Sequence, residues 1–272
     1  MLRIGKYSIV ILSLLLLTAC THVSEAALEP NWGVNNPYST AKIDHQPWQQ
    51  ILDKYLFLDK ENNSLFHYGI FTNKDRKHLK NYLSYLQDIQ IQRYSKDEQL
   101  AYWINLYNAK VVDIVLDHYP IDSFININLS NNPLKIGPVN TQVLTVLGYP
   151  LSLKHINLFV LQKYWKDSRI LFALNLAAVG SPNLQSVVYQ ADNVEQMLES
   201  NTYAFINSAQ GAKVAYYRLS VSKLFIWNKQ VFGNNDAGII QFLQRYAKPA
   251  LSSQLSKSSY ISSSYFNWSL NG

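Results

Sequence analysis

Apolar residues recur at helical spacing in several segments of the chain, and the clearest of these segments begins at a capping signal. Ser95 is followed three positions later by Glu98, which matches the capping box that opens many helices. Apolar residues then recur three and four positions apart from Leu100 to Val115. The spacing predicts a long helix that ends near Pro120, because proline rarely continues a helix.

The other periodic segments are shorter. Helices are predicted at 47–58, from 73 onward, and at 152–165, 192–209, 221–227 and 236–246, and strands at 139–147 and 214–219. The apolar run at 170–178 fits a buried strand or a buried helix equally well, and residues 121–138 are predicted to form an irregular loop. The pattern therefore predicts a mainly helical α+β fold, as a single domain with a small antiparallel sheet.

The start of the chain resembles an export signal. Arg3 and Lys6 precede an apolar run at 7–17, which is about as long as the hydrophobic region of a signal peptide. Leu-Thr-Ala-Cys at 17–20 then matches the lipobox of bacterial lipoproteins, whose cysteine is lipidated before the signal is cleaved. We therefore expect Cys20 to carry the lipid anchor of a membrane-attached protein.

A transmembrane anchor and an ordinary signal peptide are the two alternatives. A spanning helix needs about 20 apolar residues, whereas this run is shorter and is soon followed by polar residues. We therefore expect 1–19 to be a lipoprotein signal peptide, 20–45 a lipidated tether and 46–272 one globular domain. Because Thr21 and not Asp follows the cysteine, the predicted location is the outer membrane, facing the periplasm, if the host has two membranes.

Composition narrows the function classes. The chain has 24 Lys and Arg against 18 Asp and Glu, a modest excess that suits an anionic membrane surface, and it has no basic run with interleaved aromatics of the kind that binds nucleic acid. Its one cysteine is Cys20, so the predicted domain has no disulfide, no thiolate metal site and no cysteine nucleophile. The histidines show no metal-ligand spacing, and we expect neither a metal nor a cofactor.

Several motifs, taken together, resemble one family. The segment 97–109, with the sequence Asp-Glu-Gln-Leu-Ala-Tyr-Trp-Ile-Asn-Leu-Tyr-Asn-Ala, is similar to the signature helix of the domain of unknown function 547 family. The chain also resembles later blocks of that family in the same order. These blocks are Leu151-Ser152-Leu153, Arg169 with Asn175, Pro182 with Leu184, Ser220 with Trp227, and Trp268 to Asn271. The resemblance runs from about 55 to 271, and the family offers no established reaction to carry over. Together with the lipobox, it indicates a bacterial lipoprotein member of that family.

The chain departs from the family pattern where the family has reactive groups. The family's Ile-Glu-His block reads Ile156-Asn157-Leu158 here, and Leu176 and Ser181 stand where the family has two cysteines. A carboxylate, an imidazole and two thiols are thus replaced by an amide, two leucines and a hydroxyl. Since the lost groups are those of an activated thiol site, the resemblance implies a divergent member without that chemistry.

The remaining polar residues leave two interpretations open. Asn105 and Asn108 share one face of the predicted helix, where they either orient a ligand or satisfy backbone groups in the core. Asn175 and Arg169 are further candidates for ligand binding. Arg169 either pairs with a buried carboxylate or binds an anionic ligand.

Two hypotheses of function follow. In the first, a non-catalytic envelope lipoprotein binds a small ligand or an envelope partner in the groove that its relatives share. In the alternative, the domain is a serine-type hydrolase in which Ser181 is the nucleophile and His155 the base, with Asn105 or Asn175 stabilising the oxyanion. Ser181 and His155 within hydrogen-bonding reach in a concave pocket would favour the enzyme.

Overall fold

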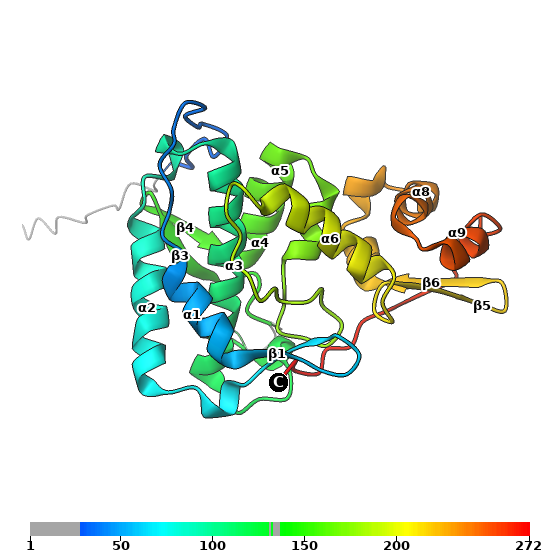
Figure 1. The fold of residues 1–272 in the computed structure, drawn as a ribbon, viewed down its shortest axis with the longest axis horizontal. Coiled ribbons are helices and arrows are strands. Elements are labelled where there is room, and N and C mark those ends of the chain that lie inside the picture. Colours follow the sequence, from blue (N-terminus) through cyan, green and yellow to red (C-terminus); the bar gives the residue numbers. More distant parts are fainter. Residues whose placement is uncertain (1–27, 131, 133–136) are drawn as a thin grey trace, which may run out of the picture.

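The computed structural model describes residues 28–130, 132 and 137–272, so the predicted signal peptide at 1–19 and the predicted lipidation site at Cys20 lie outside the described residues. Figure 1 shows a mainly helical molecule with short strands, which confirms the α+β class. None of the described helices has the length and apolar character needed to cross a bilayer. The elements are α1 (Gln46–Tyr55), β1 (Leu56–Leu58), β2 (Ser64–Phe66), α2 (Asn73–Asp88), α3 (Lys96–His118), β3 (Gln142–Val146), β4 (Tyr149–Ser152), α4 (Leu153–His155), η4 (Ile156–Leu161), α5 (Gln162–Trp165), η5 (Ser168–Ala173), α6 (Val194–Ile206), β5 (Ala212–Ala215), β6 (Arg218–Ser222), α7 (Lys223–Trp227), α8 (Asp236–Tyr246), α9 (Pro249–Leu255) and β7 (Ser263–Tyr265).

Helix α3 is the central element of the fold, because residues on almost every side of it are buried. Its start is as predicted, since the Ser95 side chain accepts a hydrogen bond from the Glu98 backbone N–H at 3.3 Å. The second half of the predicted capping box differs. The Glu98 carboxylate accepts the Ile43 backbone N–H at 2.6 Å, so it joins α3 to the segment before α1 and not to its own N-cap.

The described part of the predicted tether at 20–45 packs on the domain. Trp32 and Ile43 are both buried, and the ring of Trp32 meets that of Trp103 edge-on, with 5.3 Å between centroids. These two large apolar side chains remove the segment from water, because burying each is worth about 1.5–3 kcal/mol. The packed body therefore extends toward the N-terminus beyond the predicted boundary at residue 46.

The core consists of two clusters of buried side chains. The larger surrounds α3. The smaller is formed mainly by the end of α6 and the residues that follow it. Phenylalanine rings dominate the smaller cluster, where Phe172 contacts Phe205, Phe225 and Phe242 with centroids 5.3–5.9 Å apart. Residues 207–272, here called the C-terminal lobe, form most of this second part, at the right of Figure 1.

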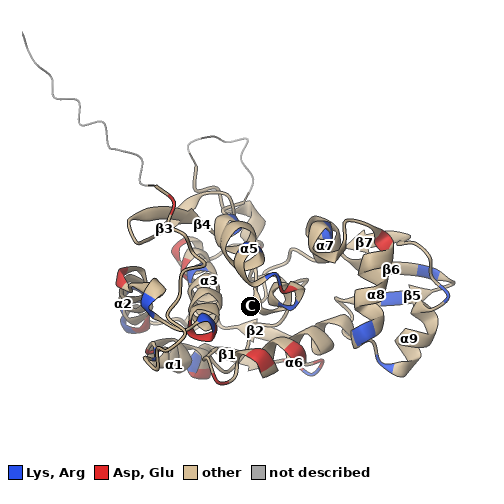
Figure 2. Cartoon of the chain, turned by 90° about the horizontal axis from the view of Figure 1, so that it is seen from above, with Lys and Arg blue, Asp and Glu red and all other residues tan. Residues whose placement is uncertain are grey.

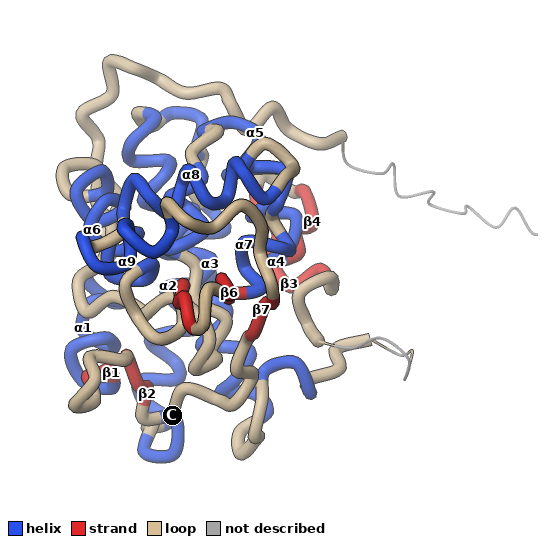
Figure 3. Tube along the Cα trace, turned by 90° about the vertical axis from the view of Figure 1, so that its right-hand side faces the viewer, coloured by secondary structure: helices blue, strands red, loops and turns tan. Residues whose placement is uncertain are grey.

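Two elements of the C-terminal lobe differ from expectation. The predicted strand at 214–219 is a hairpin, because β5 ends at Ala215 and the chain turns back into β6. Residues 263–265, within the Ser-rich stretch, form β7, which pairs with β6 in parallel. Figure 3 shows β7 beside β6. The pairs β1–β2, β3–β4 and β5–β6 are antiparallel, so the sheet is divided into small pieces, one of them mixed.

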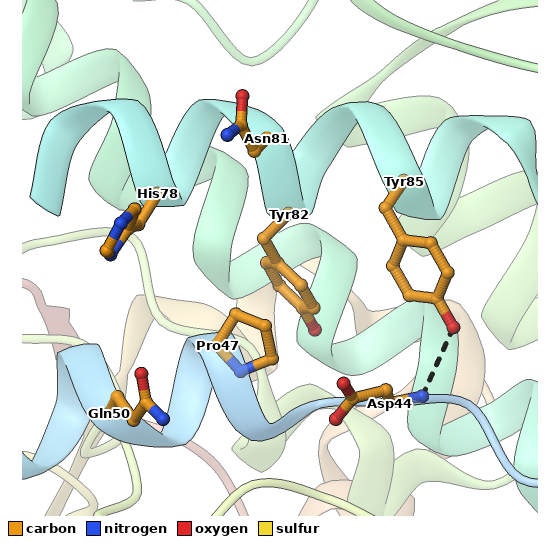
Figure 4. Close-up of a pocket in the computed structure, with 7 residues that line it drawn as sticks. All are labelled: Asp44, Pro47, Gln50, His78, Asn81, Tyr82 and Tyr85. Carbon is orange, nitrogen blue, oxygen red and sulfur yellow. Dashed lines mark hydrogen bonds between the residues drawn. The ribbon is translucent and has the colours of Figure 1, made fainter.

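A groove of about 450 Å³ lies between the start of α1 and one face of α2. Figure 4 shows its lining residues, with the Tyr85 hydroxyl accepting a hydrogen bond from the Asp44 backbone N–H. Beneath it, His45 is buried with its Nδ1 2.6 Å from the Tyr82 hydroxyl. Burial raises the pKa of Tyr82, so this phenol keeps its proton and donates it to Nδ1. The Nε2 atom of His45 is buried with no partner among the described residues.

The burial of His45 predicts a loss of stability on acidification. Desolvation lowers the pKa of His45 from 6.5 to about 4, so the unfolded chain takes up this proton first as the pH falls. Its contribution to stability is complete above pH 6.5 and is lost as the pH falls toward 4, by up to about 3 kcal/mol. Urea unfolding at several pH values across this interval measures the loss.

His45→Asn is the matched variant, because an asparagine oxygen can accept the Tyr82 hydroxyl in place of Nδ1. Acidic groups such as Asp75, whose pKa is lowered by its hydrogen bond with Lys54, are common to both chains and cancel in the comparison. The variant should lose less stability than the wild type over the same interval. Equal losses would show that His45 titrates normally in the folded chain.

Candidate functional site

Of the four positions where the resemblance implies reactive residues in the family, three line one cavity of about 250 Å³, and these are Asn157, Leu158 and Leu176. The sequence separates these residues, and the fold brings them together between the α4–η4 helix and the loop after η5. The rest of the lining comes from α3, the loop before β3, α4, α7 with the residue after it, and the segment after β7. These other lining residues are Tyr107, Val139, Leu153, Lys154, Leu224, Trp227, Asn228 and Trp268.

The cavity wall is mainly hydrocarbon and aromatic, with few polar groups. The Oδ1 atom of Asn157 is buried without a hydrogen-bond partner among the described residues. Burial raises the pKa of Tyr107, so its phenol is a neutral donor. Trp227 is about half exposed at 45% and packs on Trp268, with 5.6 Å between ring centroids. The cavity thus offers an apolar, partly aromatic surface with a free amide acceptor.

Leu176 is held at this cavity by buried amides. Asn108 on α3 donates from Nδ2 to the Ala173 carbonyl at 2.9 Å and accepts the Asn175 N–H at 2.9 Å. Asn175 in turn donates to the Pro182 carbonyl and accepts the Ala177 N–H, both at 2.7 Å. Because each amide uses both its donor and its acceptor on backbone, the loop on either side of Leu176 has a fixed path.

The segment after β7 closes the other side of this loop. The Val179 and Gly180 N–H groups donate to the carbonyls of Ser269 and Asn267, at 2.9 and 2.8 Å. A Cβ on Gly180 would lie 2.6 Å from the Asn267 nitrogen, so glycine is required for this close approach. The same segment carries Trp268 into the cavity wall.

Asn105 makes a parallel connection one turn earlier on α3. Its Nδ2 donates to the Tyr189 carbonyl at 2.7 Å, and its Oδ1 accepts the Tyr189 N–H at 3.2 Å. Asn105, Asn108 and Asn175 are all buried, and the two bonds described for each occupy their amide groups. Of the two interpretations of Asn105 and Asn108, the observed bonds correspond to satisfaction of backbone groups in the core.

The structure does not bring Ser181 and His155 together. The Ser181 hydroxyl is buried and accepts the Leu176 N–H at 3.1 Å. The His155 Nε2 lies 3.0 Å from a carboxylate oxygen of Glu29, and its ring packs between Tyr149 and Phe159. Neither residue belongs to the cavity lining, whereas Leu158 and Leu176 do.

Arg169 is held by carboxylates on the surface beside α6. Its guanidinium binds Asp167 at 2.6 Å, Glu195 at 2.7 Å and Glu199 at 3.1 Å. Hydrogen bonds with Asp167 and then Glu195 raise the pKa of Arg169 further above its usual range. Three carboxylates of the protein pair with the Arg169 guanidinium. In this structure Arg169 therefore forms ion pairs within the chain. Among the described residues, no cluster of His, Asp, Glu or Cys has the composition of a metal site.

The family described as protein of unknown function, DUF547, has a model that matches residues 91–206. That segment is similar to the DUF547 family. The match covers α3 to α6 and includes Asn157, Leu158, Leu176 and Ser181, which confirms the part of the resemblance that lies within residues 91–206. No curated protein and no solved structure matches the chain.

Several cavity residues were not among the candidates chosen from the sequence. Trp227 and Trp268 stand in blocks that resemble the closing motifs of DUF547, and neither was chosen as a candidate site residue. The exposure of Trp227 distinguishes it from core tryptophans such as Trp103, which is fully buried. Lys154 and Asn228 carry no sequence signal, because only the fold brings them to the cavity.

Asn108→Ala should destabilise the fold strongly. The change leaves the Ala173 carbonyl and the Asn175 N–H unpaired in the interior, at about 1–3 kcal/mol for each group. We expect the free energy of unfolding in urea to fall by about 2–5 kcal/mol. Asn81→Ala on the exposed face of α2 is the control, with an expected change within about 0.5 kcal/mol. Similar small changes in both variants would show that the Asn108 amide does not fix the loop.

Proposed function

We propose that this chain is an envelope lipoprotein, lipidated at Cys20, whose domain binds a small and mainly apolar ligand without transforming it. The proposed location is the outer membrane, facing the periplasm, where the host has two membranes. The observation that carries the proposal is the cavity itself. Three of the four replacement positions converge on it, and they present an amide and two leucines where the family pattern has Glu, His and Cys.

The chemistry of the cavity supports binding over catalysis. Asn157 neither donates a proton as an acid nor accepts one as a base near neutral pH, and the leucines have no reactive group. A catalytic nucleophile needs an adjacent base, and the Ser181 hydroxyl instead accepts a backbone N–H. The cavity persists although its reactive groups are absent, and this is the pattern expected of a retained binding site.

The size and lining of the cavity define the ligand class. A volume of about 250 Å³ lies just below the usual range for drug-sized ligands, so the ligand is a small ring system or the end of a longer chain. Trp227 and Trp268 favour a flat or apolar group. The unpaired Oδ1 of Asn157 favours a ligand with one hydroxyl or N–H donor, because that group would satisfy it.

A direct test uses 2-naphthol, a flat aromatic with one hydroxyl, titrated into the full-length chain in a calorimeter. We expect saturable binding to the wild type. Leu176→Phe should weaken binding at least about tenfold, since misfit of a few carbons in an apolar pocket has effects of this size. Val187→Phe, at an exposed position outside the cavity lining, is the control and should bind like the wild type.

Asn157→Leu separates the polar contribution from the apolar one. It should weaken the binding of 2-naphthol and leave the binding of naphthalene, which has no donor, unchanged. Equal binding by all variants would place the ligand elsewhere and contradict the proposed site. Labelling of the chain by a fluorophosphonate, lost in Ser181→Ala, would instead support a serine hydrolase and contradict a non-catalytic role.

The lipid anchor has its own test. Cells grown with radioactive palmitate should incorporate the label into the wild-type chain, and Cys20→Ser should abolish it, because the acceptor of the glyceride is the thiol of Cys20. A labelled Cys20→Ser chain, or an unlabelled wild type with an unmodified Cys20 by mass spectrometry, would overturn the proposed anchoring.

A further inference from the structure

The β5–β6 hairpin ends in an unusual turn. Its two central residues, Tyr216 and Tyr217, have φ values of 50° and 60°, the backbone pattern of a type I′ turn, which favours Asn and Gly. A bulky residue is disfavoured at positive φ. Both side chains are nearly fully exposed, at 96% and 90%. Packing within the described structure therefore does not compensate for placing two tyrosines at this turn.

Charge is distributed very unevenly between the two parts of the molecule. Residues 28–206 contain 15 Lys and Arg against 16 Asp and Glu, whereas the C-terminal lobe contains seven Lys and Arg against a single acid, Asp236. Figure 2 shows basic positions on β5, β6, α7 and α8. Asp236 pairs with Lys229 at 2.7 Å, and the other six cations of the lobe have no ion pair among the described residues.

Three of these unpaired cations surround the tyrosine turn. Lys213 and Arg218 are exposed and lie on the outer face of the hairpin, because their partners across the ladder, Ser220 and Ala215, share that face. The alternating residues of the hairpin face the core of the lobe. Lys257 lines a cleft of about 290 Å³ together with Tyr216 and Tyr217. We call Lys213, Tyr216, Tyr217, Arg218 and Lys257 the hairpin surface.

We infer that the hairpin surface docks on an anionic phospholipid bilayer. Tyrosine side chains collect at the boundary between lipid and water, where the ring meets apolar groups and the hydroxyl meets water. Lysine and arginine beside them are attracted to anionic headgroups. The two kinds of group lie together at the tip of a projecting hairpin, so both reach a flat surface at once.

A bilayer is favoured over another polyanion because a membrane is the anionic surface nearest to a lipid-anchored protein. The choice of a bilayer as the partner rests on the proposed envelope location. The observations on the turn and on the charge distribution are independent of that location. Docking through the C-terminal lobe would add a second contact to the lipid anchor and fix the orientation of the domain. Two weak membrane contacts together bind more firmly than either one alone.

The test uses the full-length chain with Cys20→Ser and Gln254→Cys, labelled at Gln254→Cys with an environment-sensitive fluorophore. Gln254 is exposed and lines the cleft beside Tyr216 and Tyr217, so the label reads the hairpin surface and not the N-terminal segment. We expect a blue shift with vesicles of equal parts phosphatidylcholine and phosphatidylglycerol. Pure phosphatidylcholine should give none, and added salt should reverse the shift by screening.

Two variants distinguish the roles of the rings and the charges. Tyr216→Asn with Tyr217→Gly removes both rings and installs the residues that a type I′ turn prefers, so its melting temperature should equal or exceed that of the parent. Lys213→Glu with Arg218→Glu reverses the charge of the outer face. Each pair should abolish the shift. Lys74→Glu with Lys77→Glu, at exposed positions on α2, is the matched control and should retain it.

Three results would overturn the inference: no shift with anionic vesicles, an equal shift with neutral vesicles, or a shift that survives loss of both tyrosines. A shift produced by heparin or DNA and not by anionic vesicles would also overturn it and would indicate a soluble polyanion as the partner. If palmitate labelling succeeds and the vesicle assay fails, the proposed anchoring stands and only this docking surface is lost.

Discussion

The bonds from buried asparagine side chains on α3 to the backbone of the following loop are the constraint on which the cavity depends. A loop without regular structure leaves many backbone groups unpaired, and inside a protein each must find a partner. Asn105 and Asn108 supply donors and acceptors in pairs from one rigid helix. The backbone of the loop is consequently held in one path, and the hydrogen bonds that hold it come from side chains.

This arrangement separates the scaffold of the site from its chemistry. The amides of Asn108 and Asn175 that hold the loop around Leu176 are not at replaced positions. Ser181 is the exception, because it is a replaced position and its hydroxyl accepts the Leu176 N–H. Replacement of a thiol, an imidazole and a carboxylate therefore leaves the backbone path intact. The exchange also adds apolar surface at the cavity, because leucines occupy positions 158 and 176.

Local signals in the sequence were sufficient for the capped helices and insufficient for contacts that tertiary structure decides. Helix α3 begins where Ser95 predicts, because capping is a local interaction. The hairpin at 212–222 was missed, since Tyr216-Tyr217 has none of the residues that mark a turn. For the site, the family pattern identified the positions that meet at the cavity. Pairing Ser181 with His155 relied on sequence proximity alone, and helix geometry directs His155 toward Glu29 instead.

The return of the chain from β7 to the body has a consequence for biosynthesis. Trp268 completes one wall of the cavity, and the Asn271 carbonyl accepts the Phe66 N–H at 2.7 Å, so residues about 200 positions apart in the sequence must meet. A nascent chain still on the ribosome cannot make these contacts until residues 267–271 have emerged. The segment around α3 therefore lacks this wall of the cavity until the last part of the chain has emerged.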